Sequence, residues 1–173
     1  MPENYTQLVM RRRNLDNLPD IAIPEGFCLR AYRGGDEPAW DSIVGEMCRD
    51  GFAKAIKSHR FFAPERVKMI CRGETPVATA TAWGELTGGD TPGIVHMVAT
   101  DPSYRGRGLG FAVTNAVLHR LAYEGKTAAY LTTDDFRVPA IKIYLKLGFK
   151  PDMTKEGHID RWEKLHKLLN IDK

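Results

Sequence analysis

One short stretch of the 173-residue sequence, "TDPSYRGRGLGFAV" at residues 100–113, places two arginines and three glycines within six positions. It follows a run of β-branched and apolar residues and precedes residues that favour helix. A turn from a strand into a helix is suited to hold phosphate, because the first helical N–H groups lack intrahelical partners and the helix dipole is positive there. Glycine lets the backbone approach closely, and arginine adds a forked cation. The stretch therefore predicts a site for a phosphate-bearing ligand.

Two common nucleotide-binding motifs do not fit this turn. A dinucleotide-binding fingerprint needs a further glycine, but that position falls on Phe111 or Val113, depending on where the count begins. A Walker loop needs Gly-Lys followed by Ser or Thr, and the sequence contains no such run. The alternative to a phosphate site is a structural turn whose glycines let a helix pack against a sheet.

The elements that position the turn follow from the spacing of apolar residues. The pattern predicts strands at residues 27–32, 94–100 and 128–133, a hairpin at 66–83 that turns at Gly73, and a short strand at 149–151. It predicts helices at residues 38–50, 109–121, 137–147 and 159–169, and it leaves residues 54–65 ambiguous. We expect one mixed α/β domain at residues 26–153, an irregular lead-in at 1–25 and a C-terminal helix at 154–173.

Composition narrows the class of protein. A formal net charge of +3 is too small to indicate a nucleic-acid partner, and the basic run Arg11–Arg13 is interpreted as a solvated surface, with DNA association as its alternative. No window approaches the roughly 18 apolar residues of a membrane span, and the N-terminal residues lack the apolar core of a secretion signal. Three widely spaced cysteines without a CxxC pair favour neither disulfides nor a metal site. We therefore expect a cytoplasmic protein with no membrane, nucleic-acid or metal partner.

A second pattern, "AIKIYLKLGF" at residues 140–149, begins about 30 residues after the glycine turn. With Arg-Gly-Arg-Gly-Leu-Gly at residues 105–110, it resembles the two signatures of the GNAT family, the GCN5-related N-acetyltransferases: [QR]-x-x-G-x-[GA] after a strand, and A-[IV]-x-x-Y-x-x-x-G-F near the C-terminus. The resemblance covers residues 27–153. The longer run "DDFRVPAIKIYLKLGF" is distantly similar to mycothiol synthase-type acyltransferase domains.

The resemblance implies a central mixed sheet of about six or seven strands, splayed between the fourth and the fifth and flanked by helices. It implies acetyl-CoA as co-substrate, with its pyrophosphate on the glycine turn. The pantetheine arm is expected to pair with the backbone of the preceding strand, as a peptide adds to a sheet edge. The implied cofactor-binding residues are Val98, Ala99, Thr100, Arg105, Gly106, Arg107, Gly108, Leu109, Gly110 and Phe111.

The expected reaction is direct attack of an amine on the thioester in a ternary complex, which poses two proton transfers. An alkyl ammonium has a pKa of about 10.4 and must lose a proton before attack, and the departing thiolate must gain one. Tyr144 matches the family tyrosine that commonly supplies that proton. Because a phenol (pKa about 10) is a weaker acid than a thiol (about 8.5), Tyr144 also acts as a hydrogen-bond donor to sulfur. His96 is the candidate base, expected on the same strand face as Val98.

The sequence departs from the family pattern at two positions. Many members carry a glutamate where this chain has Ile94, and an asparagine where it has Val138. The first change leaves the base open, and Glu85, Asp134 and Asp135, each near the end of a predicted strand, are further candidates. The second change removes one expected contact to the pantetheine arm.

The sequence thus predicts an acetyl-CoA-dependent N-acetyltransferase that acts on an amine of a small molecule or peptide. The alternative is a non-catalytic acyl-CoA-binding or regulatory module. Acceptor specificity is expected from residues 33–65, the loop at 86–93 and the C-terminal tail, and the basic run at 49–60 suggests an acceptor with a carboxylate. The oligomeric state stays open between monomer and homodimer.

Overall fold

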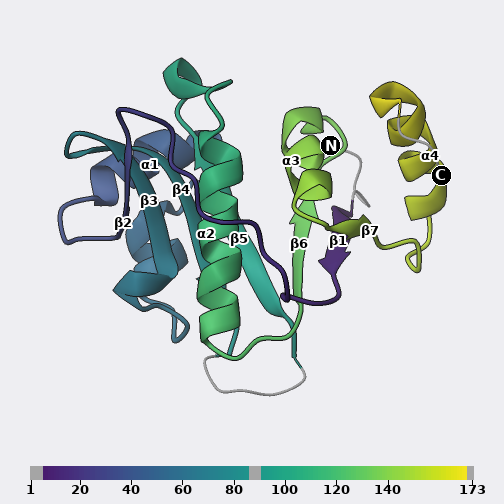
Figure 1. The fold of residues 1–173 in the computed structure, drawn as a ribbon, viewed down its shortest axis with the longest axis horizontal. Coiled ribbons are helices and arrows are strands. Elements are labelled where there is room, and N and C mark those ends of the chain that lie inside the picture. The colour runs from purple at the N-terminus through teal and green to yellow at the C-terminus, as the bar shows by residue number, and fades with distance from the viewer. Residues whose placement is uncertain (1–5, 86–90, 171–173) are drawn as a thin grey trace.

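The computed structural model describes residues 6–85 and 91–170, with a seven-stranded sheet at its centre (Figure 1). In chain order the strands are β1 (Leu8–Arg12), β2 (Cys28–Ala31), β3 (Val67–Arg72), β4 (Thr75–Trp83), β5 (Gly93–Thr100), β6 (Ala129–Thr133) and β7 (Lys150–Pro151). The α-helices are α1 (Glu37–Val44), α2 (Leu109–Tyr123), α3 (Val138–Lys146) and α4 (His158–Leu169). Shorter helical turns are three of 3₁₀ type and one of π type: Gly45–Met47, Pro64–Arg66, Pro102–Tyr104 and Ala53–Lys57.

The strands lie in the order β2-β3-β4-β5-β6-β1-β7, and of the neighbouring pairs only β5 and β6 are parallel within the described residues. The predicted α/β fold, a mixed sheet of six or seven strands flanked by helices, is confirmed. The predicted hairpin turns at Gly73, whose φ of +58° suits a residue without a Cβ. The loop expected at 86–93 falls mainly on residues 86–90, which lie outside the described part of the chain.

Helices cover both faces of β3, β4 and β5, and α2 crosses the face turned to the viewer in Figure 1. Alternate side chains of β3 point to opposite faces. Met69 and Cys71 belong to a core with Trp40 of α1, and we call this side of the sheet the α1 face. Ile70 belongs to a larger core with Leu118 of α2, which defines the α2 face. The functional residues can therefore be assigned to one face or the other.

The prediction that residues 1–25 are irregular is wrong for β1. This strand lies between β6 and β7 and is antiparallel to both, so it is an interior strand of the sheet. Leu8, Val9 and Met10 are all buried, which explains why they show no alternation of apolar and polar residues. The arginines that follow and the prolines of this segment concealed the strand in the sequence.

After β1, residues 14–27 cross the outer surface of α2 without forming a helix or strand (Figure 1). Asn115 of α2 donates a hydrogen bond from Nδ2 to the carbonyl of Pro19 at 2.8 Å. His119, one turn further along α2, has its Nε2 2.9 Å from the same carbonyl. The segment therefore ties β1, which lies between β6 and β7 in the sheet, to α2, which packs on the face of β3, β4 and β5.

A buried ion pair holds the C-terminal end of α2 against the segment before β3. Arg66 is fully buried, and its guanidinium donates to both carboxylate oxygens of Glu124, at 3.0 and 2.8 Å. It also donates to the carbonyls of Phe61 and Gly84, both at 2.9 Å. A buried guanidinium is tolerated only when its charge and its donors are matched in this way.

Glu124→Gln is expected to lower the free energy of unfolding by about 3–5 kcal/mol, because it leaves the buried Arg66 charge without a counter-charge. Urea unfolding measured by circular dichroism tests this. The matched control is Glu46→Gln, since Glu46 pairs with Arg49 in a bridge whose two side chains are each 84% exposed. That change should alter stability by less than about 0.5 kcal/mol. Equal effects of the two substitutions would contradict the assignment.

Candidate active site

β5 and β6 lie side by side for two residue pairs and then part. Gly93 lies opposite Ala129 and Ile94 opposite Tyr130, and no later described residue of β5 pairs with β6. A Cβ on Gly93 would lie 2.5 Å from Leu121 of α2, so glycine lets that helix approach the sheet here. The parting confirms the splay predicted between the fourth and fifth strands of the family pattern, which are β5 and β6 in Figure 1.

A β-bulge in β5 follows directly after this last pair. Thr81 of β4 lies opposite His96, but Thr79 lies opposite Ala99, so β5 contains one more residue than β4 over this interval. Met97 takes up the extra length with a φ of +49°, a left-handed conformation that side chains with a Cβ rarely adopt. Bulges bend a strand and increase its twist. The bulge accounts for the way β5 leaves β6.

Beyond the bulge, β5 has one bonded edge and one open edge. Ala99 and Thr100 are paired with β4, opposite Thr79 and Ala78. The edge that faces β6 has no strand partner among the described residues. An extended amide-bearing chain could add to this edge as a strand does. Val98, Ala99 and Thr100 lie along this edge, and their pairing with a pantetheine arm stays a prediction.

The glycine turn lies at the N-terminus of α2 and is open to solvent. Gly106 and Gly108 have φ values of +76° and +81°, and Gly108 is the N-cap residue of the helix. The first α2 amide with an intrahelical partner is that of Ala112, which donates to the Gly108 carbonyl at 3.1 Å. The amides of the preceding residues, Leu109 to Phe111, are those that a helix start leaves available for an anion.

The two arginines of this turn have no carboxylate partner among the described residues. Arg105 donates from Nε to the Thr100 carbonyl at 3.4 Å, and the Arg107 guanidinium lies 5.6 Å from the ring centroid of Tyr104. The first turn of α2 also carries no acidic residue, although acids are favoured at a helix N-terminus. Positive charge is therefore concentrated here, as an anion site requires.

The third glycine of the turn, Gly110, allows α2 to pack closely against α3 and the end of β5. A Cβ on Gly110 would lie 3.1 Å from Cδ1 of Ile143 on α3 and 3.7 Å from Oγ1 of Thr100. This close approach brings the start of α2, the end of β5 and α3 together. Tyr144 follows Ile143 on α3, so the helix that carries the candidate acid is in contact with the candidate cofactor turn.

Tyr144 belongs to the core on the α2 face, with only 6% of its surface exposed, and its ring lies edge-on to Phe149 at 6.1 Å. Burial raises the pKa of Tyr144 to about 12, and the charge of Arg137 opposes this rise. Its hydroxyl has no hydrogen-bond partner among the described residues. The phenol is thus held protonated and is available as a donor.

His96 lies on the other face, which corrects the expectation that it shares a face with Val98. Its ring stacks on Trp83 at a centroid distance of 5.2 Å, within the core of the α1 face, whereas Val98 packs on the α2 face. The bulge at Met97 breaks the alternation of side chains and causes the switch. Tyr144 and His96 are therefore on opposite faces of the sheet.

The surroundings of His96 favour its neutral form. Burial, and then the charge of His59, lower the pKa of His96 below its ordinary value. His59 stacks on Trp83 at 4.9 Å, so the indole contacts both imidazoles. Neither ring nitrogen of His96 has a hydrogen-bond partner in the described part of the chain. A neutral imidazole with free nitrogens can accept a proton.

The acidic alternatives to His96 are engaged with arginines. Glu85 is paired with Arg60. Asp134 accepts from Arg137 Nε at 2.8 Å and from Gln7 Nε2 at 3.1 Å. The third candidate, Asp135, is paired with Arg161. These pairs leave His96 as the candidate base without such a partner among the described residues.

Sequence reasoning missed three side chains near the splay. Arg137, at the start of α3, contacts the sulfur of Met47, which follows α1, so the contact joins elements before β5 to elements after β6. Thr79 and Thr81 of β4 have buried hydroxyls that neither donate a hydrogen bond to a described residue nor accept one from it. They lie opposite Ala99 and His96, next to the bulge. No local sequence pattern signals any of these placements.

The basic run at residues 49–60 is not a free cationic surface. Its four arginine and lysine side chains each pair with a carboxylate: Arg49 with Glu46, Lys54 with Asp50, Lys57 with Glu37 and Arg60 with Glu85. These pairs remove the sequence-based reason to expect an acceptor with a carboxylate.

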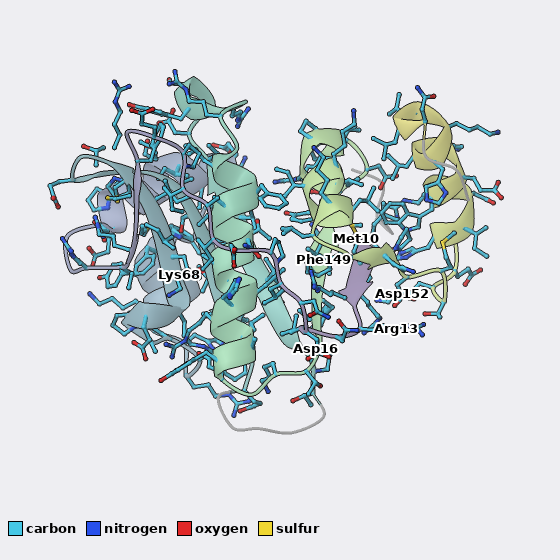
Figure 2. All side chains as sticks on the ribbon, viewed as in Figure 1. Met10, Arg13, Asp16, Lys68, Phe149 and Asp152 are labelled. Carbon is cyan, nitrogen blue, oxygen red and sulfur yellow. The ribbon has the colours of Figure 1, made fainter. Side chains whose placement is uncertain are left out.

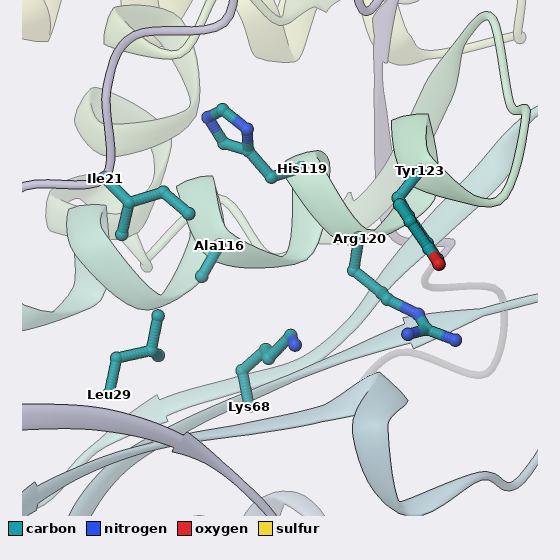
Figure 3. Close-up of a pocket in the computed structure, with 7 residues that line it drawn as sticks. All are labelled: Ile21, Leu29, Lys68, Ala116, His119, Arg120 and Tyr123. Carbon is teal, nitrogen blue, oxygen red and sulfur yellow. The ribbon is translucent and has the colours of Figure 1, made fainter.

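Two hollows of the surface lie away from the splay. One, of about 270 Å³, lies between α2, β3 and the crossing segment, and its lining includes Ile21, Leu29 and Ala116 (Figure 3). Lys68 reaches into it from β3, and burial lowers the pKa of its ammonium group. The other, of about 940 Å³, lies beside β1 and β7. No described group of three or more His, Cys, Asp or Glu side chains is arranged to hold a metal ion.

Comparison with known proteins finds a matching family model and relatives that are named acetyltransferases. Residues 30–149 match the model of the acetyltransferase (GNAT) family. A mycothiol acetyltransferase of Thermomonospora curvata is 31% identical over 153 residues, which cover 82% of this chain and 50% of the relative. One of Nocardia farcinica is 28% identical over 170 residues, covering 89% and 54%. The chain spans about half the length of the curated relatives it matches.

Solved structures have the same fold. A GCN5-related N-acetyltransferase from Kribbella flavida has a TM-score of 0.59 at 25% identity, covering 84% of this chain and 54% of that one. Another from Sphaerobacter thermophilus has a TM-score of 0.64 at 22% identity, covering 84% and 48%. With the splayed strands, the glycine turn and the family match over most of its length, this chain belongs to the GNAT acetyltransferase family.

Proposed function

We propose that this chain is an acetyl-CoA-dependent N-acetyltransferase that acetylates an amine of a small molecule or peptide by direct attack in a ternary complex. The observation that carries the proposal is the opening of β5 away from β6 beside a helix N-terminus whose two arginines, Arg105 and Arg107, have no carboxylate partner among the described residues. When bound there, acetyl-CoA supplies a thioester, an acyl group activated for attack by an amine. Relatives named mycothiol acetyltransferase support acetyl transfer as the reaction class.

The residues of the turn fit a diphosphate. The amides of Leu109, Gly110 and Phe111 would donate to phosphate oxygens, and Arg105 and Arg107 would add charge-assisted hydrogen bonds. Beyond the bulge, the open backbone edge of Val98 to Thr100 would hold the amide-bearing arm. Holding both reactants in one place supplies most of the catalysis, since aligned reactants reach effective molarities of about 10⁵–10⁸ M.

Two side chains then handle the protons, from opposite faces of the splay. His96, neutral and without a hydrogen-bond partner among the described residues, would accept the proton of the attacking ammonium. Tyr144 would donate a hydrogen bond to the sulfur as the C–S bond breaks and the C–N bond forms. Full proton transfer from a phenol of pKa about 12 to a thiolate whose conjugate acid has a pKa of about 8.5 is uphill by about 5 kcal/mol. Tyr144 therefore acts mainly by stabilising the developing charge.

Coenzyme A should bind with measurable heat, and replacing both arginines with alanine (Arg105→Ala/Arg107→Ala) should weaken binding by about 10- to 100-fold, because two charge-assisted contacts to phosphate are lost. Isothermal titration calorimetry measures both. Arg72→Ala/Lys164→Ala, which removes two exposed cations elsewhere, is the control and should leave the affinity unchanged. An absence of heat with millimolar coenzyme A would falsify the proposal.

Release of thiol from acetyl-CoA should depend on an amine, and a panel of amino acids, aminoglycosides, peptide N-termini and mycothiol-related amines tests this. With the best acceptor, Tyr144→Phe should lower kcat by about 100-fold while coenzyme A affinity stays the same, because only a charge-stabilising donor is lost. If the unsubstituted protein binds coenzyme A but releases no thiol with any amine of the panel, the result would favour the non-catalytic alternative.

His96 should titrate with a midpoint below pH 6.5, because burial disfavours its cation. Its ring is then neutral at pH 7 and loses its capacity as a base only as the pH falls through that lower value. NMR titration of the imidazole Cε1–H signals, with His96→Gln to assign the resonance, measures the midpoint. His96→Gln should also lower kcat by about 100-fold. A midpoint at or above 6.5 would count against this role.

A further inference from the structure

A strongly cationic hollow of about 940 Å³ lies beside β1 and β7, away from the splay. It is lined by residues 11–14, at the end of β1, and by residues of the 148–154 segment, on either side of β7. Figure 2 shows Arg13 and Asp152, one from each segment, at this edge of the molecule. The basic run that the sequence presented as a solvated surface is therefore part of a concave site.

Charge in this hollow is unbalanced. Its lining includes four cationic side chains, those of Arg11, Arg12, Arg13 and Lys150, and one carboxylate, that of Asp152, which leaves a net charge of +3. Like charges gathered around a concave surface repel one another, and an anion placed between them relieves this repulsion.

Asp152 cannot neutralise more than one of these cations. Its Oδ2 accepts from Arg11 Nε at 2.6 Å, and its Oδ1 accepts from the backbone N and Oγ1 of Thr154 at 3.0 and 2.6 Å. These bonds hold the pKa of the Asp152 carboxyl well below its usual range, so it stays ionised and paired. Arg12, Arg13 and Lys150 remain without a counter-charge from the part of the chain that the structure describes.

One of the three, Arg12, is fixed in place. Its guanidinium donates to the backbone carbonyls of Asn14 at 2.9 Å, Asp16 at 3.2 Å and Leu147. Gly148 leaves room for it, since a Cβ there would lie 3.3 Å from Nη1 of Arg12. Carbonyl oxygens satisfy the donors of Arg12 but carry no net charge, so its positive charge persists in the wall of the hollow.

The other two cations, Arg13 and Lys150, are exposed and free to bind. Neither has an ion pair or hydrogen bond with the described residues. The hollow thus combines one immobile guanidinium with a second guanidinium and an ammonium that can move to meet a ligand. Guanidinium groups bind phosphate oxygens in pairs, and lysine adds a compact point charge.

We propose that this hollow is a binding site for a small phosphate-bearing anion with two or more negative charges. Three uncompensated cations favour multiple charges on the ligand, and a concave site within the usual volume range of small-molecule sites favours a small molecule over an extended nucleic-acid backbone. The site is separate from the glycine turn and does not depend on the proposed acyl transfer.

Calorimetric titration with inorganic triphosphate tests the proposal. Two controls exclude binding of triphosphate at the glycine turn. In the first, saturating coenzyme A is added before the titration to occupy the turn. In the second, the titration is repeated in the Arg105→Ala/Arg107→Ala variant, which tests the same point even if coenzyme A does not bind. We expect Arg13→Ala/Lys150→Ala to weaken triphosphate binding by about tenfold or more, since two charged contacts are lost. Arg72→Ala/Lys164→Ala removes the same residue types outside the hollow and should change the affinity by less than twofold. Thermal unfolding verifies that each variant is folded.

Three outcomes would overturn the proposal: no heat with millimolar triphosphate, equal weakening in both double variants, or binding of a single-stranded oligonucleotide through Arg13 and Lys150 without binding of triphosphate. Its failure is distinct from failure of the proposed function, which concerns coenzyme A and Arg105 and Arg107. Either site can bind its ligand when the other does not.

Discussion

The β-bulge at Met97 is the constraint on which the rest of the site depends. One extra residue in β5, held in a left-handed conformation, bends the strand away from β6 after only two residue pairs. A left-handed conformation costs a residue with a Cβ roughly 1–2 kcal/mol, so surrounding contacts must hold it. Met97 packs in the core of the α1 face, and β4 bonds to β5 on both sides of the bulge. The sheet interior thus stabilises a feature that local sequence would not choose.

The same bulge distributes the chemistry over two faces. Without it, His96 and Val98 would point to the same side of the sheet, as strand alternation requires. With it, His96 turns to the α1 face beside Trp83 and His59, while Tyr144 approaches from the α2 face. An acyl group held between the strands would then have a base on one side and a hydrogen-bond donor on the other. In the proposed reaction the amine loses a proton while the sulfur accepts a hydrogen bond, and this arrangement would let separate side chains serve the two steps.

Much of this architecture is predictable from local pattern, and the exceptions have physical causes. The glycine turn can be recognised in the sequence because its positions favour glycine. Gly106 and Gly108 have positive φ values, and a side chain at Gly110 would crowd Ile143 of α3. The bulge is not visible, because its extra residue is a methionine and not the glycine that a left-handed position favours. Within residues 49–60, Arg49 and Lys54 pair with nearby acids at helical spacing, which the sequence does show. Lys57 and Arg60 pair with Glu37 and Glu85, which are distant in sequence, so local pattern alone leaves these two cations free.

β1 shows a different limit of local pattern. Its apolar run is short and lacks alternation because the strand is covered on both faces, and only its position between β6 and β7 explains this. That position has a structural consequence. Before the splay, the two parts of the sheet are joined by two β5–β6 pairs. Other links are the contact of α2 with α3 and the segment that leaves β1 and crosses α2. Near its end, Pro24 reaches Gly108, where a Cβ would lie 3.9 Å from the proline ring. One continuous stretch of chain therefore lines the cationic hollow, completes the sheet and abuts the glycine turn, which makes residues 8–24 part of the framework of the GNAT fold.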